Sequence, residues 1–265
     1  MTITLRQICL VAEDLQSNLA DFEAIFGLKV CFIDPGVGVF GLENALMPIG
    51  TNLLEIVSPT KAGTAGGRYL ERRGGDGGYM VITQAESLQV QADVKSHAQD
   101  LGVRIAWERD WPIGGDHGNT EPANILQFHP ADTGGAFFEL DWDSHCEFEG
   151  HWLPAGGNGW QDKINQDVIG DFVAVEMQSE DPAALAQRWS TLTGLSQKQE
   201  NDIPTLSFSN ATLRFVQAVD GRGDGLGGLD VTARDAAKAL KTARERGLQV
   251  TDDQIIICGT RFNLI

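Results

Sequence analysis

Hydrophobic and polar positions follow an order that begins near the N-terminus and then recurs along the chain. Residues 5–12 form an apolar run of strand length, and residues 15–26 carry apolar side chains at helical spacing. Asp14 is suited to cap that helix because its carboxylate can accept free backbone N–H groups, and Gly27 is suited to end it. Strands are predicted next at 28–33, 37–42 and 51–58. This stretch therefore predicts one repeat of strand, helix and further strands.

The same order returns three times. The second repeat has a predicted strand at 79–84, a helix at 88–101 and strands at 103–108, about 123–129 and 136–142. The third has a strand at 172–177, a helix that ends at Leu192 and strands near 205–209 and 211–217. The fourth has a strand at 228–232, a helix at 235–246 and strands at 249–258 and 261–265. The sequence thus predicts an α+β fold of four βαβββ-type repeats, the last two shortened.

A single repeat leaves one apolar sheet face uncovered, so we expect the repeats to pair. We predict a first domain at 1–145, which holds repeats at 3–60 and 76–142, and a compressed second domain at 169–265. Residues 146–168 are rich in Trp, Gly and polar side chains and are predicted to form a linker that packs in part. Whether the first repeat pairs with the second or with the fourth is left open by the sequence.

Composition narrows the class of protein. The chain has 265 residues with 20 basic and 37 acidic side chains, a formal net charge of -17. Such a surface repels phosphate backbones and anionic lipids, which argues against nucleic-acid or membrane partners. No apolar run approaches the length of a membrane span, and the N-terminus does not resemble a signal peptide. The four cysteines, at 9, 31, 146 and 258, lack disulfide or metal spacing, which predicts reduced thiols and a cytoplasmic protein.

Three segments carry a resemblance to a known family: residues 7–15 (QICLVAEDL), residues 53–57 (LLEIV) and residues 129–140 (HPADTGGAFFEL). Together with the repeat, they resemble the vicinal oxygen chelate superfamily, which includes glyoxalases, methylmalonyl-CoA epimerases, extradiol dioxygenases and bleomycin-resistance proteins. The resemblance implies that modules pair into half-open mixed-sheet barrels, with metal ligands on the first and last strands of each module.

Carried onto this chain, the resemblance implies a ligand set of Gln7, Glu55 and Glu139. It also implies one divalent metal, such as Ni, Zn, Mn or Fe, because oxygen donors suit hard or borderline ions. The fourth position departs from the pattern, since Met80 stands where the family has His, and a thioether is a poor ligand for such ions. A polar remnant that binds no metal is therefore the alternative.

Two carboxylates that share a partly dry site repel one another, so one of them should have a raised pKa and serve as a general base. By resemblance, Glu139 is the predicted base and Glu55 the predicted ligand. A metal beside them would polarise a substrate carbonyl and stabilise an enediolate.

Further residues are candidates for substrate binding. Arg72 and Arg73 precede a glycine-rich bend in a chain that is otherwise acidic, and Arg can hold a carboxylate or phosphate with two bonds. The alternative is a connecting helix that ends at Gly74. Met80 and His129 are expected near the same pocket, although a His before Pro also stabilises a turn. The remaining histidines, at 97, 117, 145 and 151, show no metal spacing.

Three hypotheses follow. The first is a metal-assisted glyoxalase-like or epimerase-like lyase or isomerase that acts on an α-oxo or thioester compound. The second is a metal-free protein that sequesters a small molecule, as bleomycin-resistance proteins do. The third is a scaffold whose repeats mediate assembly. The expected partner is a small molecule, and a homodimer is compatible with all three.

Overall fold

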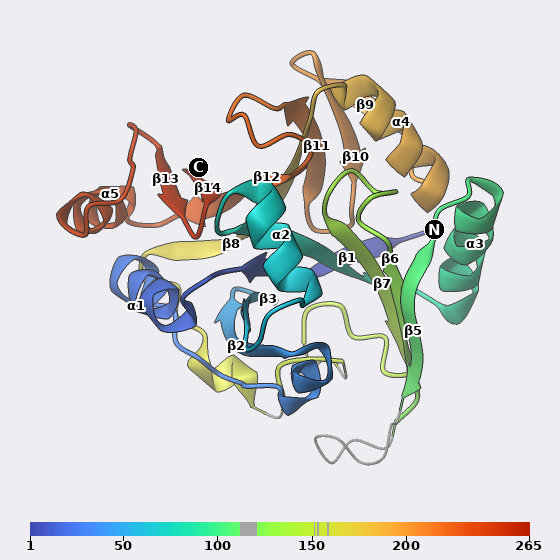
Figure 1. Cartoon of the computed structure of the whole chain (residues 1–265), viewed down its shortest axis with the longest axis horizontal. Coiled ribbons are helices and arrows are strands. Elements are labelled where there is room, and N and C mark those ends of the chain that lie inside the picture. The colour runs from blue at the N-terminus through green and yellow to red at the C-terminus, as the bar shows by residue number, and fades with distance from the viewer. Residues whose placement is uncertain (112–120, 151, 153, 158) are drawn as a thin grey trace. The chain divides into compact units, whose positions relative to one another are not determined.

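The structure is a computed structural model that describes residues 1–111, 121–150, 152, 154–157 and 159–265 (Figure 1). His117 and His151 lie outside these residues. The described elements repeat the predicted order of strand, helix and strands. Parallel and antiparallel strand pairs occur side by side with helices, which confirms the α+β class. No helix in the described part of the chain is long and apolar enough to cross a membrane.

The chain divides into two compact units. Unit 1 combines residues 1–7, 80–155 and 175–226, and unit 2 combines residues 8–79, 156–174 and 227–265. The second and third repeats therefore share unit 1, whereas the first and fourth repeats share unit 2. Four strands contribute residues to both units: β1 (Ile3–Val11), β4 (Gly77–Ala85), β8 (Ile169–Ser179) and β12 (Gly225–Ala233). The division into consecutive domains at 1–145 and 169–265 stays a prediction.

Unit 2 holds the remaining elements of the first and fourth repeats, together with part of the linker. These elements are α1 (Leu15–Phe26), η1 (Pro35–Phe40), β2 (Leu42–Ile49), β3 (Asn52–Pro59), α2 (Ala65–Arg73), η3 (Trp160–Lys163), α5 (Ala236–Glu245), β13 (Gln254–Ile257) and β14 (Thr260–Leu264). β2 and β3 form an antiparallel hairpin in which Leu46 faces Glu55. β14 lies parallel to β12 and antiparallel to β13.

An aromatic cluster joins the two repeats of unit 2. The ring centroid of Phe262 on β14 lies 5.4 Å from that of Phe22 and 5.6 Å from that of Phe26, both on α1. All three side chains are fully buried. Arg246 also donates a hydrogen bond to Asp21 at 2.5 Å. The first repeat thus buries its helix against the fourth, which answers the pairing question that the sequence left open.

Unit 1 holds α3 (Leu88–Asp100), β5 (Ile105–Trp111), β6 (Ala123–Phe128), β7 (Phe137–Asp143), α4 (Pro182–Thr193), β9 (Lys198–Glu200), β10 (Ile203–Ser207) and β11 (Thr212–Gln217). β7 lies parallel to β4 and antiparallel to β6. Trp189 of α4 packs 4.7 Å from the Phe138 ring, and its indole N–H donates to the Thr133 carbonyl at 2.9 Å. Helix α4 therefore packs on this sheet through buried aromatic side chains.

Local sequence signals account for the helix ends. Asp14 accepts a hydrogen bond from the Ser17 backbone N–H, and Gly27 closes α1 in the left-handed conformation, as predicted. The predicted helices at 88–101 and 235–246 match α3 and α5 within a residue at each end.

Two predicted strands are wrong. Residues 28–33 are not a strand and make only an isolated bridge between Phe32 and Leu46, and the segment predicted as a strand at 37–42 falls mostly in the 3-10 helix η1. Asp34 caps η1 through the Gly36 N–H, and Gly41 ends it with a positive φ of 70°. The Asp-Pro-Gly turn continued into a 3-10 helix, because Pro suits a first helical position better than a strand.

Candidate functional site

A row of carboxylates lies on one face of β7 in unit 1. Glu139, Asp141 and Asp143 alternate with apolar or aromatic residues, and side chains two apart in a strand point to the same face. Their exposed fractions are 6%, 0% and 0%. Ile82 of β4 lies in register with Glu139, and Gln84 lies in register with Asp141. The site is therefore a buried acidic strip on β7, next to the parallel strand β4.

Asp143 closes the strip at its C-terminal end and is well supplied with hydrogen-bond donors. Its Oδ1 accepts from the backbone N–H groups of His145 and Cys146 at 2.9 and 3.1 Å, and its Oδ2 accepts from the Gln84 amide at 3.0 Å. Burial raises the pKa of Asp143, and these donors and the nearby Arg6 guanidinium oppose that rise.

Asp141 and Glu139 form a closely spaced carboxyl pair. Unlike Asp143, Asp141 has no side-chain amide donor on its two oxygens among the described residues, and only the Leu126 backbone lowers its pKa. Burial raises the pKa of Asp141 well above its ordinary value, and the charge of Glu139 and a hydrogen bond to it raise that pKa further. Two carboxyl groups can hydrogen-bond only when one carries a proton. The raised pKa therefore favours the protonated form of Asp141 beside Glu139.

Arg6 supplies positive charge to the strip. Its Nη1 donates to Gln84 Oε1 at 2.6 Å and to the Glu147 carbonyl, and its Nη2 donates to the Gly150 carbonyl at 2.7 Å. The guanidinium also lies over the Trp152 ring, 5.3 Å from its centroid. Burial lowers the pKa of Arg6 to about 10, although the acidic neighbours oppose this. Arg6 stays protonated at neutral pH and reaches Asp143 through Gln84.

The other predicted ligands lie on separate strands. Gln7 is buried on β1 and belongs to unit 1 with Glu139, whereas Glu55 is buried on β3 in unit 2. Glu55 Oε1 accepts a hydrogen bond from Asn44 Nδ2 at 2.5 Å. Met80 lies on β4 in register with Phe137 and is 8% exposed. The convergence of Gln7, Glu55 and Glu139 stays a prediction.

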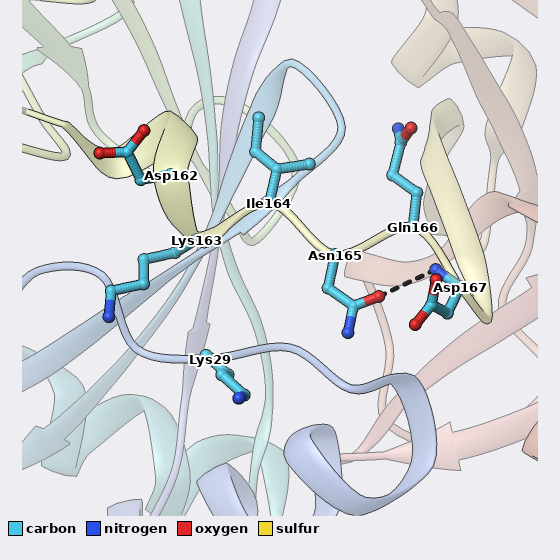
Figure 2. A pocket seen from close by; sticks show the side chains of 7 residues that line it. All are labelled: Lys29, Asp162, Lys163, Ile164, Asn165, Gln166 and Asp167. Carbon is cyan, nitrogen blue, oxygen red and sulfur yellow. Dashed lines mark hydrogen bonds between the residues drawn. The ribbon is translucent and has the colours of Figure 1, made fainter.

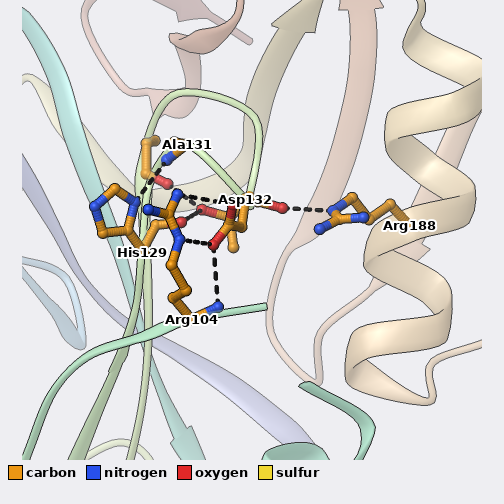
Figure 3. A network of polar contacts seen from close by, with 7 residues as sticks. Arg104, His129, Ala131, Asp132 and Arg188 are labelled. Carbon is orange, nitrogen blue, oxygen red and sulfur yellow. Dashed lines mark hydrogen bonds and ion pairs between the residues drawn. The ribbon is translucent and has the colours of Figure 1, made fainter. Parts of the chain in front are cut away.

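His129 lies in the turn between β6 and β7. Its Nδ1 accepts a hydrogen bond from the Ala131 backbone N–H at 3.2 Å (Figure 3). In the same turn, Arg104 holds Asp132 through two side-chain hydrogen bonds of 2.7 and 3.0 Å, and Arg188 of α4 donates to the Asp132 carbonyl. These contacts support the turn-stabilising interpretation of His129; its predicted substrate-binding role stays a prediction.

Arg72 and Arg73 occupy the last turn of α2, and Gly74 caps that helix with a positive φ of 70°. Their guanidinium carbons lie 5.4 and 6.0 Å from the centroid of the Tyr69 ring. Positive charge at a helix C-terminus is favourable because the last carbonyls are negative. The connecting-helix alternative is therefore confirmed in geometry, and substrate binding by these arginines stays a prediction.

The donors of the acidic strip do not fit a metal centre of His, Cys, Asp and Glu ligands. In the part of the chain that the structure describes, no three such residues are grouped so that they could hold an ion. The raised pKa of Asp141 favours its protonated form, and a protonated carboxyl is a poor ligand. We assign no metal to this strip.

A shallow polar cavity of about 440 Å³ lies elsewhere, in unit 2 (Figure 2). Segment 162–167 of the linker and Lys29 line it. Two lysines there are matched by Asp162 and Asp167, and the Asn165 side chain accepts from the Asp167 N–H at 2.9 Å. Its charges balance, so it offers no concentrated field for a charged ligand.

Sequence reasoning found Glu139 and missed its neighbours. Asp141, Asp143 and Arg6 were not among the predicted site residues. The signal was present, because acidic residues at 139, 141 and 143 follow the two-residue period of a strand whose intervening positions are apolar or aromatic. Such alternation is typical of a strand with one solvated face, so only the structure shows that this acidic face is buried.

The chain matches no protein-family model and no curated protein sequence. Among solved structures, it is similar to a hypothetical protein from Staphylococcus aureus, with a TM-score of 0.64, 14% identity and coverage of 100% of this chain and 99% of that one. It is also similar to the Mn(II)-bound glyoxalase from Novosphingobium aromaticivorans, with a TM-score of 0.64, 10% identity and coverage of 98% and 81%.

A mutant of 4-hydroxymandelate synthase from Streptomyces coelicolor has a TM-score of 0.61 and 14% identity, with coverage of 93% of this chain and 76% of that one. These identities are low, and what the neighbours share with this chain is the path of the backbone. The chain therefore has a glyoxalase-like fold, as the sequence resemblance predicted.

Proposed function

We propose that the protein is a glyoxalase-like enzyme that moves a proton on the carbon next to a carbonyl group of a small molecule. Glu139 is the base that takes the proton, and Asp141 holds the second proton of the pair. The observation that supports this proposal is the carboxyl pair itself, buried at 6% and 0% exposure on one face of β7.

The proposed proton transfer follows from the carboxyl pair of Glu139 and Asp141. A buried carboxylate beside a protonated carboxyl can accept a proton from carbon while its partner donates a hydrogen bond to the charge that forms. Low local dielectric strengthens both interactions. Arg6 and Gln84 keep Asp143 in place at the end of the strip, so the strip keeps one geometry while protons move. Isomerase and lyase reactions of α-oxo or thioester compounds both begin with such a step.

The proposal is tested by proton exchange in D₂O. The protein is incubated with a hemithioacetal of an α-oxo aldehyde and, separately, with a 2-methylacyl thioester, and the α-proton is followed by NMR. We expect Glu139→Gln to lower the exchange rate about 10²–10⁴-fold, the usual range for a lost general base. Glu108→Gln, a half-exposed carboxylate of the same unit paired with Lys95, is the matched control. Equal rates in the wild type and Glu139→Gln would refute the proposal.

We propose separately that the protein binds a divalent metal. One structural neighbour is described as Mn(II)-bound, and Gln7, Glu55 and Glu139 are the residues that would hold an ion here. Elemental analysis of protein purified without chelator tests this directly. A stoichiometric metal that is lost in both Gln7→Ala and Glu55→Ala would support the site, and a metal content far below stoichiometric would exclude it.

A small-molecule binding protein without catalysis is the second candidate. The observation that favours it is Met80, which stands where the family resemblance expects a metal-binding His, because a thioether is a poor ligand for a hard or borderline ion. Thermal stabilisation by a ligand in the presence of EDTA, with no α-proton exchange, would distinguish binding from catalysis.

A further inference from the structure

Strand β5 of unit 1, which pairs with β6, separates its charged side chains between its two faces. Glu108 lies on the side of α3, where its carboxylate accepts a hydrogen bond from Lys95 at 2.6 Å. Asp110 shares that face because it lies two residues further on, and it accepts from the Asn124 amide at 2.7 Å. Arg109 lies between these two acids in sequence and therefore points to the opposite face of the strand.

That opposite face of β5 continues across the sheet to the acidic strip. Trp107 lies directly opposite Gln127 of β6, and Gln127 lies directly opposite Glu139 of β7. Residues opposite one another in antiparallel strands place their side chains on one face, so these three form a row across strands that lie side by side (Figure 1). Arg109 lies two residues from Trp107, and Asp141 lies two residues from Glu139, so both share this face.

The row has a buried end and an accessible end. Glu139 is 6% exposed, whereas Gln127, Trp107 and Arg109 are half-buried. Neighbouring strands lie about 4.8 Å apart, so side chains of β5 stand roughly 10 Å from those of β7. A small molecule that extends along this row from Glu139 therefore reaches β5 roughly 10 Å from its reacting carbon.

Arg109 and Trp107 form a pair at the accessible end. The guanidinium carbon of Arg109 lies over the Trp107 ring, 5.8 Å from its centroid. A guanidinium is planar and carries its N–H donors in that plane, so contact with a ring face does not use them. A carboxylate can accept two parallel hydrogen bonds from one such fork. One guanidinium also neutralises the single charge of a carboxylate, but only part of the charge of a phosphate monoester.

We propose that Trp107 and Arg109 bind a carboxylate of the substrate while the reacting carbon lies at Glu139. The substrate is then a thioester or α-oxo compound with a carboxylate roughly 10 Å from the carbon that loses its proton. This assignment rests on the proposed function, because Glu139 places the reacting carbon. The chain has a net charge of -17 and repels anions at long range, so the preference for an anion depends on Arg109 at contact distance.

The test compares two compounds that differ in this charge. The probes are the isobutyryl thioester of mercaptohexanoate, whose extended chain spans the row, and the corresponding primary amide. Their dissociation constants are measured by isothermal titration calorimetry in Glu139→Gln, the parent for this test, so that proton exchange does not accompany binding. We expect the carboxylate to bind about tenfold or more tightly than the amide, because the bond from Arg to a carboxylate is charge-assisted.

Arg109→Gln in this parent should remove the preference. We expect a loss of about tenfold or more in affinity for the carboxylate and a change within about twofold for the amide. Arg104→Gln is the matched control, because Arg104 is a largely exposed arginine of the same unit that pairs with Asp132; both affinities should stay unchanged. Should Arg109→Gln not fold, titration of the parent at rising salt replaces it, and the preference for the carboxylate should shrink as salt screens the charge.

Equal affinities for the two compounds in the parent would overturn the carboxylate site. A preference that survives in folded Arg109→Gln, or a parent that binds neither compound, would overturn it as well. The readout is separate from proton exchange. Exchange that depends on Glu139 without a preference for the anion would overturn only this site, whereas a preference lost in Arg109→Gln without such exchange would support the site and refute the enzyme function.

Discussion

The carboxyl groups of the acidic strip differ in their hydrogen-bond partners. Asp143 is satisfied by two backbone N–H groups and Gln84, whereas Asp141 has only a carboxyl neighbour and the backbone near Leu126. Along a single strand face, the environment therefore separates an acid that accepts many hydrogen bonds from one that keeps its proton. This separation is what makes acid–base chemistry feasible at neutral pH.

Asp141 should make stability fall as pH rises. Its folded pKa is raised, while in the unfolded chain it titrates near the ordinary value of about 4. Above that pH the unfolded chain releases a proton that the folded chain keeps, so unfolding becomes progressively easier until the folded pKa is reached. We expect the thermal midpoint of Asp141→Asn to improve relative to wild type as the pH rises above about 4. A difference that does not change with pH would contradict this.

Asp132 should make stability rise with pH, which is opposite to the effect of Asp141. The hydrogen bond from Arg104 lowers its pKa to about 2. Its stabilising effect is complete above the unfolded pKa and is lost as pH falls toward 2, so acid should erase the difference between wild type and Asp132→Asn. Thermal scans at neutral and acidic pH measure this. Because Arg104 is largely exposed, the effect should be small and weaken in high salt.

Removal of the Arg6 side chain should lower the free energy of unfolding by a large amount. Arg6→Ala removes three charge-assisted hydrogen bonds and leaves buried acidic groups without their cation, which should lower the free energy of unfolding by about 3–5 kcal/mol. Denaturant titration measures the loss, and Arg104→Ala is the exposed control. A loss similar to that of the control would show that Arg6 does not anchor the strip.

At the scale of elements, the sequence was most informative where capping residues and hydrophobic periodicity agree. Asp14 and Gly27 mark both ends of α1, and Leu15–Phe26 carries the helical spacing between them. The prediction from sequence was wrong where a turn could continue either into a strand or into a 3-10 helix. Residues 37–42 contain Val and Phe, which favour a strand, but the preceding Asp34 and Pro35 began a 3-10 helix that ends at Gly41.

The candidate site was predictable in part for the same reason. The family resemblance singled out Glu139 on a predicted strand, and only the pairing with β4 revealed that Gln84 and Arg6 lie beside the acidic strip. Contacts between residues about 80 and 140 positions apart depend on strand register, which a single repeat does not encode. The linker packing was hidden for a related reason, since Gly156 is informative only once Trp160 and Leu53 are known to flank it.

At the scale of the molecule, repeats that are distant in sequence share a core. Phe262 of the fourth repeat fills a cluster with Phe22 and Phe26 of the first. Phe262→Ala should lower the free energy of unfolding by about 3–5 kcal/mol, because it leaves a large cavity in a buried aromatic cluster. Hydrogen exchange should increase in α1 more than in α3, which belongs to unit 1. Equal increases in both helices would contradict this assignment of repeats to units.

The central claim is that one carboxyl of the strip is protonated at neutral pH and that Glu139 can therefore work beside it as a base. Carbon-13 NMR of protein labelled at its Asp and Glu carboxyl carbons reads this directly, with Asp141→Asn and Glu139→Gln to assign the signals. The account predicts one carboxyl signal that stays in the protonated position at pH 7 and disappears in Asp141→Asn. A spectrum in which every carboxyl group is ionised at pH 7 would contradict it.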